Sequence, residues 1–188
     1  MQGFVFCEFQ EYVQRTFGPE TWDQIAERAG VKGKSYSLFS SYPTPELEGL
    51  INQLSEVVRR PYQELLEECG MYIAPKLWRI SKRMIPSKWT LADLIMNITG
   101  FTDHILAHAI SGTDVPPTMR CEKTGPDEVT IHYYSPRKMC AMGKGIVRGM
   151  GRQYGVDVTV TEPQCMLRGD PECEIVFHMH KKVAVASE

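Results

Sequence analysis

The sequence has almost no net charge and no long apolar segment. Its 188 residues carry a formal net charge of −2, which gives no reason to expect nucleic acid or an anionic membrane surface as a partner. No apolar run is long enough to span a bilayer, so we expect no membrane insertion. Residues 1–8 lack the basic start and the apolar core of a signal peptide, and we therefore expect a cytoplasmic protein.

The sequence also lacks the usual combinations of catalytic residues. It contains no credible pair of nucleophile and base, no phosphate-binding loop and no paired carboxylates in an apolar setting. We therefore expect a binding protein rather than an enzyme. Internal repeats and low-complexity segments are absent too, and the hydrophobic fraction of 43% is high enough to exclude a disordered chain.

The first part of the chain favours helices, because its apolar residues recur at helical spacing. Thr44 is predicted to cap a helix with Pro45 at its first position, and Pro75 should kink the helix in which it lies. The expected helices span residues 4–17, 21 to about 30, 44–58, 61–77 and 90–111.

Beyond residue 116 apolar and polar residues alternate, which predicts strands at 119–123, 128–134, 156–161, 164–167 and 172–179. Residues 138–154 return to a helical pattern. Four glycines make one face of that helix thin, so we expect another element to pack close to it. They are Gly143, Gly145, Gly149 and Gly151.

These patterns predict an α+β fold in which a helical N-terminal subdomain packs on a C-terminal antiparallel sheet with a long helix. The connectors are too short for two independent domains, so we expect one domain over residues 1–181. Its helical subdomain would cover about residues 1–60 and the remainder about 61–181. Residues 182–188 are predicted to form a flexible tail.

Tyr133, Ser135 and Arg137 form the most informative motif. Alternate positions on an extended segment point to one face, so these three side chains can converge on one anionic ligand. Arginine offers a planar fork that matches a carboxylate, and the two hydroxyls can fill the remaining lone pairs. An apolar ligand with carboxylates would suit the site, and haem with its propionates is one such ligand. The simpler interpretation is a strand end with a solvated arginine.

His104 lies in the expected helix 90–111, and His108 follows four residues later on the same face. Such a pair can bind zinc, but no glutamate adjoins His104, which excludes the metalloprotease motif. A helical histidine is more often a hydrogen-bonded core or surface residue. His104 differs because Pro116, Pro117 and then the tyrosine–serine–arginine motif follow it in order.

With these residues in this order, the sequence resembles the haem-nitric oxide/oxygen-binding domains, called H-NOX, of bacterial sensors and soluble guanylate cyclases. The resemblance covers essentially the whole chain. The matching residues are Met1, Gly3, His104, Pro116, Pro117, Tyr133, Ser135, Arg137, Lys138 and Met139.

The resemblance implies a haem b cofactor and a role for each matching site residue. His104 would be the axial ligand of the haem iron. Tyr133, Ser135 and Arg137 would hold the propionates, and Pro117 would press on the porphyrin. It implies no role for His108, which we expect to be exposed.

The gas-binding side of the pocket is expected to be apolar. Met142 stands five positions after Arg137, where oxygen-binding members of the family have a tyrosine that donates a hydrogen bond. The other expected distal residues are Val5, Phe9, Ile73, Leu77 and Ile146. Oxygen on ferrous haem needs a hydrogen-bond donor, so we expect a sensor that binds nitric oxide and carbon monoxide but excludes oxygen.

Nitric oxide weakens the bond opposite it, so we expect the link between His104 and iron to break. The haem could then relax away from Pro117 and the two subdomains could move. The signal would pass to a separate protein, and stand-alone members of the family pair with a histidine kinase or a diguanylate cyclase.

Three cysteines suggest a second site. Cys165 and Cys173 flank a turn, and Cys140 begins the long helix; thiolates are good zinc ligands, and a structural zinc site needs four ligands. Some H-NOX proteins are similar, with three cysteines and one histidine on zinc, but this chain has Glu162 at the position of the histidine. The fourth ligand could therefore be Glu162, His178 or His180. Three reduced thiols or a thiol redox switch are the alternatives.

A different class of function also stays open. The chain could be a haem-free module that binds a small molecule, or a zinc and thiol redox module, related to vinyl-reductase-like domains. A Soret absorption band would distinguish a haem protein from such a module.

Overall fold

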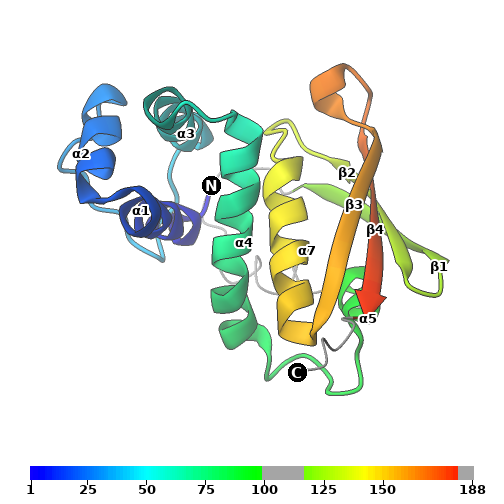
Figure 1. The fold of residues 1–188 in the computed structure, drawn as a ribbon. Helices are drawn as coiled ribbons and strands as arrows, with labels where there is room; N and C mark the ends of the chain where they lie inside the picture. Colours follow the sequence, from blue (N-terminus) through cyan, green and yellow to red (C-terminus); the bar gives the residue numbers. More distant parts are fainter. Residues whose placement is uncertain (99–116, 182–188) are drawn as a thin grey trace, which may run out of the picture.

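The computed structural model describes residues 1–98 and 117–181. Helices α1, α2 and α3 lie on one side of the molecule, the sheet lies on the other, and α4 and α7 stand side by side between them (Figure 1). The helices are α1 (Gly3–Phe17), α2 (Pro19–Arg28), α3 (Thr44–Val58), α4 (Tyr62–Ser81), α5 (Leu91–Met96) and α7 (Cys140–Tyr154).

The helix predictions other than 90–111 are confirmed in position, with one error in a cap. Pro43 is the N-cap of α3, and the Thr44 hydroxyl makes no capping hydrogen bond. Pro43 already has the extended backbone that an N-cap requires, which moves Thr44 into the first turn. Pro75 lies inside α4, which continues past it to Ser81.

The predicted helix 90–111 can be compared only at its start. Thr90 caps α5 in a capping box, accepting from the Asp93 backbone N–H while the Asp93 carboxylate accepts from the Thr90 N–H. Helix α5 ends at Met96. The predicted helical residues 99–111 lie outside the described residues.

The sheet is antiparallel, with strand order β1-β2-β4-β3. Its strands are β1 (Thr118–Gly125), β2 (Glu128–Tyr134), β3 (Val156–Gln164) and β4 (Cys173–Lys181). The predicted strand at 164–167 is wrong, because Met166–Arg168 forms a short 3-10 helix, η1. Local hydrogen bonds replace strand pairing there, since the Arg168 N–H donates to the Cys165 carbonyl at 2.8 Å.

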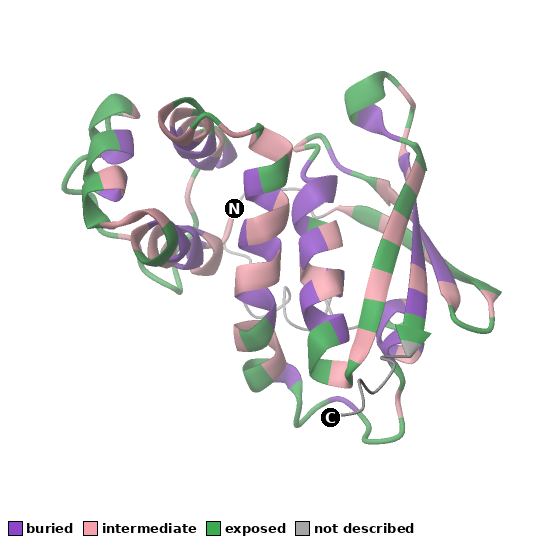
Figure 2. Ribbon diagram, in the orientation of Figure 1, coloured by how far each residue is buried: buried purple, intermediate pink, exposed green. Residues whose placement is uncertain are grey.

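Two clusters of buried side chains form the core. One is built from α1 to α4 and the first turn of α7; the other lies between α4, α5, α7 and the inner face of the sheet. Central strand β4 is largely buried, whereas edge strand β3 is partly or fully exposed along its length (Figure 2). Leu77 and Ile146 are partly buried and pack against both clusters.

Helices α4 and α7 touch through their backbones, as the glycine pattern predicted. A Cβ added at Gly145 would lie 1.9 Å from the Glu67 carbonyl oxygen, and one at Gly149 would lie 2.4 Å from the Ala74 Cβ. Gly143 differs, because nothing lies within 4 Å of its Cβ position. The close contact fixes the separation of the two helices that carry four of the expected pocket residues.

None of the helices within residues 1–98 and 117–181 combines the length and the apolar character needed to cross a membrane.

Candidate functional site

A turn at the end of β2 brings Arg137 back over Ser135. The Lys138 N–H donates to the Ser135 carbonyl at 2.9 Å, and Lys138 adopts a left-handed backbone with φ of 49°. This reversal leads the chain from β2 into α7. The Arg137 backbone N–H and Nε then approach the Ser135 hydroxyl at 3.3 and 3.5 Å. A non-glycine residue in this conformation costs about 1–2 kcal/mol, which the surrounding structure has to offset.

Tyr133 joins the same group. Burial raises the pKa of the Tyr133 hydroxyl, while the Ser135 hydroxyl and the Arg137 guanidinium act in the opposite direction. Tyr133 therefore stays protonated at neutral pH and can donate a hydrogen bond. Ser135 is fully buried, whereas Tyr134 and Pro136 point to solvent, so the expected alternation is present. We call Tyr133, Ser135 and Arg137 the clamp.

Pro117 lies at the same end of the sheet as the clamp. It immediately precedes Thr118, whose partner across the β1–β2 ladder is Tyr134. His104, Pro116 and His108 lie outside the described residues, so the structure gives no position for the expected axial ligand.

The six expected distal residues all belong to one apolar cluster, and we call these six residues the apolar wall. Phe9, Ile73 and Met142 are buried in it, and Val5, Leu77 and Ile146 are partly buried against it. They come from α1, α4 and α7, three helices whose positions the α4–α7 contact helps to fix.

Several tyrosines belong to the same cluster, and four of them use their hydroxyls in hydrogen bonds to protein groups. Three of them donate to carboxylates: Tyr12 to Glu68 at 2.9 Å, Tyr36 to Glu46 at 2.7 Å and Tyr72 to Glu11 at 3.0 Å. The hydroxyl of Tyr42 accepts from the Ser37 N–H at 2.8 Å. The O–H groups of Tyr12, Tyr36 and Tyr72 are therefore committed as donors to carboxylates, whereas Tyr42 takes part as an acceptor.

The second predicted site is also brought together. One ligand atom from each of Cys140, Glu162, Cys165 and Cys173 lies within 4.8 Å of all the others. The Sγ of Cys165 lies 3.9 Å from the Sγ of Cys140 and 3.7 Å from that of Cys173. Tetrahedral zinc with Zn–S bonds of about 2.3 Å places its sulfurs about 3.8 Å apart. We call these four residues the cysteine cluster.

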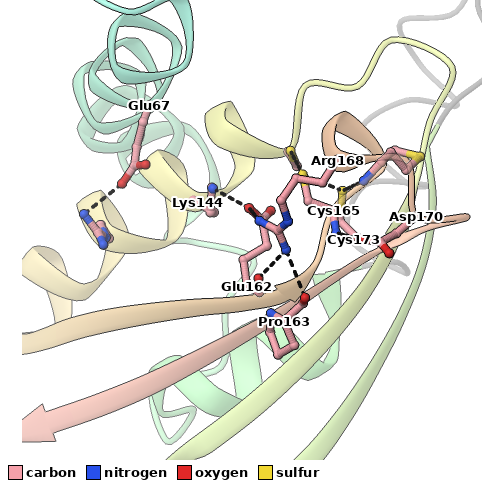
Figure 3. Close-up of polar contacts among 11 residues, drawn as sticks. Glu67, Lys144, Glu162, Pro163, Cys165, Arg168, Asp170 and Cys173 are labelled. Atoms are coloured by element: carbon pink, nitrogen blue, oxygen red, sulfur yellow. Dashed lines mark hydrogen bonds and ion pairs between the residues drawn. The ribbon is translucent and has the colours of Figure 1, made fainter.

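The turn around η1 positions two of the thiols (Figure 3). The Cys165 N–H donates to the Asp170 carboxylate at 2.7 Å, and the Met166 N–H donates to the Cys173 sulfur at 3.3 Å. Burial raises the pKa of the Cys140 and Cys173 thiols, so both are neutral at pH 7 without a compensating cation. A bound divalent ion would supply that compensation.

Neither of the alternative histidine ligands reaches the cysteine cluster. His178 Nδ1 lies 2.9 Å from the Glu128 carboxylate, and His180 Nε2 lies 2.9 Å from the Thr159 hydroxyl. Alternation along β4 places both histidines on the sheet face opposite to Cys173. Glu162 is thus the fourth candidate ligand in the described part of the chain.

Two cations that the sequence did not predict lie beside Glu162. Lys144 Nζ lies 3.2 Å from Glu162 Oε2, and Arg168 Nη1 lies 3.7 Å from the same oxygen (Figure 3). Lys144 follows Cys140 by one helical turn, which is a signal that places both on one face of α7. Nothing in the local sequence pairs Arg168 with Glu162.

Comparisons with known proteins show the family to which the chain is related. A family model described as Haem-NO-binding matches residues 2–162. Two soluble guanylate cyclases of Caenorhabditis elegans, gcy-32 and gcy-35, are 25% and 24% identical to this chain over 169 residues. The matches cover 85% of this chain but 24% of each cyclase, so the chain spans about a quarter of the length of these relatives.

Solved structures show the same fold. An H-NOX protein from S. oneidensis in the Fe(II)NO ligation state has a TM-score of 0.86 at 18% identity, covering 96% of this chain and 100% of that one. The unliganded Fe(II) H-NOX protein from K. algicida has a TM-score of 0.81 at 17% identity, covering 97% and 98%. The predicted α+β fold is confirmed. Because the family model also spans most of the sequence, the chain belongs to the Haem-NO-binding, or H-NOX, family.

Proposed function

We propose that this H-NOX domain is a haem-based sensor that binds nitric oxide and carbon monoxide at ferrous iron and excludes oxygen. The apolar wall supports the proposal, because its six side chains, which we expect on the gas-binding side, offer no strong hydrogen-bond donor. The domain would sense rather than catalyse.

The clamp fits the acidic groups of haem b. A protonated Tyr133, the buried hydroxyl of Ser135 and the Arg137 guanidinium supply donors suited to propionates. His104 would supply the axial imidazole, and Pro117 would bear on the porphyrin face. When bound, the haem supplies a ferrous iron with one open position for a diatomic gas.

The apolar wall explains the expected selectivity. Oxygen bound to ferrous haem concentrates negative charge on its outer atom and is stabilised by a hydrogen-bond donor. Met142 offers a thioether where a donor would be needed, and the hydroxyls of Tyr12, Tyr36 and Tyr72 donate to carboxylates instead. Nitric oxide depends little on such a bond and should bind well.

A single substitution tests this selectivity. In air-saturated buffer the reduced wild-type protein should show no oxygen-dependent spectral shift before it slowly oxidises. The variant Met142→Tyr should gain such a shift, because it adds a hydroxyl to the apolar wall, while Met142→Leu should behave as wild type. An immediate, stable spectral change of the wild-type protein in air would contradict the proposal.

The signal would leave the domain by motion. Release of His104 from the iron when nitric oxide binds would free the segment that carries it. The helices of about residues 1–60 would then move against residues of about 61–181. Both parts would belong to a single domain over residues 1–181. The receiver would be a separate protein, a histidine kinase or a diguanylate cyclase, as the sequence resemblance implies.

Zinc binding is a second candidate function, supported by the cysteine cluster. The distances between its sulfurs suit a tetrahedral zinc ion, and Glu162 supplies a fourth ligand. A thiol redox switch is the competing interpretation. Metal analysis of the protein purified under reducing conditions should find one zinc ion per chain; its absence would favour the redox switch.

A further inference from the structure

The two carboxylate oxygens of Glu162 have different surroundings. Oε2 faces Lys144 and Arg168, whereas Oε1 is buried and has no hydrogen-bond partner in the described part of the chain. The Glu162 side chain as a whole is 14% exposed. Because buried polar oxygens are normally bonded, Oε1 is the atom suited to bind a cation.

The charges around the cysteine cluster explain why two cations gather there. A zinc ion with three thiolates and one carboxylate carries two negative units, one more than the same ion with a neutral imidazole as fourth ligand. Lys144 and Arg168 supply two positive units at the carboxylate. Lys144 is held in a largely buried position, with its side chain 17% exposed.

Arg168 also fixes the backbone that carries Glu162. Its Nη2 donates to the Glu162 carbonyl at 2.6 Å and to the Pro163 carbonyl at 3.0 Å (Figure 3). Lys144 approaches from α7, one turn after Cys140. The two cations therefore join the helix, the end of β3 and the η1 turn around one carboxylate.

We infer that Lys144 and Arg168 form a charge-balancing pair at Glu162 Oε2. This pair lets a carboxylate complete the metal site through Oε1 in place of an imidazole. The inference rests on the proposed zinc site and concerns its positioning residues. Such partners of metal ligands typically change metal affinity by about 10–100-fold when they are removed.

The test is zinc affinity, measured on the full chain by competition with a chelator under reducing conditions. Lys144→Gln and Arg168→Gln should each weaken zinc binding about tenfold or more, and Lys144→Arg should restore most of the affinity. The matched control is Arg148→Gln, also on α7, because Arg148 pairs with Glu67 at 2.8 Å instead. This control should bind zinc as wild type does.

A second pair of variants separates charge balance from general destabilisation. With a neutral imidazole at the fourth position in Glu162→His, adding Lys144→Gln should have little further effect on zinc affinity. Equal losses of zinc affinity in the two backgrounds, or no loss in either, would overturn the charge-balancing role of Lys144 while leaving the zinc site standing. A reduced wild-type chain that binds no zinc would overturn both the zinc site and the charge-balancing pair.

Discussion

Ser135 is a fully buried hydroxyl that contacts Arg137, and the turn through Lys138 holds the two side chains together. The spacing of Tyr133, Ser135 and Arg137 predicted a shared face from the sequence alone, because alternate residues of an extended segment point the same way. The left-handed Lys138 was not predictable, since nothing in a lysine side chain favours that conformation.

Arg137→Ala should weaken the retention of haem b. An ion pair with hydrogen bonds to a carboxylate is worth about 1.5–3 kcal/mol, so loss of the guanidinium should weaken haem binding roughly tenfold or more. The measurement is transfer of haem to an excess of a second haem-binding protein. Arg137 Nη1 lies 3.9 Å from the Met1 sulfur, and Arg152 Nη2 lies 3.9 Å from the Met71 sulfur. Arg152→Ala is therefore the control, because Arg152 has a similar contact but lies outside the clamp. Equal haem loss from both variants would argue against a propionate role for Arg137.

At the scale of elements, the α4–α7 contact and the cysteine cluster show which features a sequence can predict. The glycines of residues 138–154 predicted a thin helix face, and the structure places Glu67 and Ala74 against it. The cysteine spacing predicted that the thiols gather, and the family resemblance offered Glu162 as one of three possible fourth ligands; the structure brings Glu162 to the thiols. By contrast, the sequence pattern at η1 predicts a strand. The structure differs because the hydrogen bonds there come from Asp170 and the turn itself rather than from a neighbouring strand.

Two glycine substitutions on α7 should have opposite effects on stability. Gly145→Ala puts a methyl group against the Glu67 carbonyl and should lower the free energy of unfolding by about 1–3 kcal/mol. Gly143→Ala meets nothing within 4 Å and should raise it by about 0.5–1 kcal/mol, since alanine favours a helix. Urea unfolding of both variants provides the comparison. Equal stability of the two would mean that α4 and α7 do not pack this closely.

In the molecule as a whole, the clamp lies at one end of the sheet and the apolar wall lies on three helices. Two residues of the wall, Leu77 and Ile146, contact both core clusters. A helical part and a sheet part could be predicted because helical and alternating patterns separate cleanly along the chain. The cations around Glu162 could not be predicted, because long charged side chains choose partners through tertiary structure rather than local pattern.

We propose that the clamp and the apolar wall enclose a ferrous haem that responds to nitric oxide. The most direct measurement is the absorption spectrum of the reduced protein without oxygen, recorded before and after nitric oxide is added. We expect a Soret band that shifts on addition of the gas. A protein that shows no Soret band after haemin has been supplied, or a band that does not change with nitric oxide, would mean that this domain is not a haem-based nitric oxide sensor.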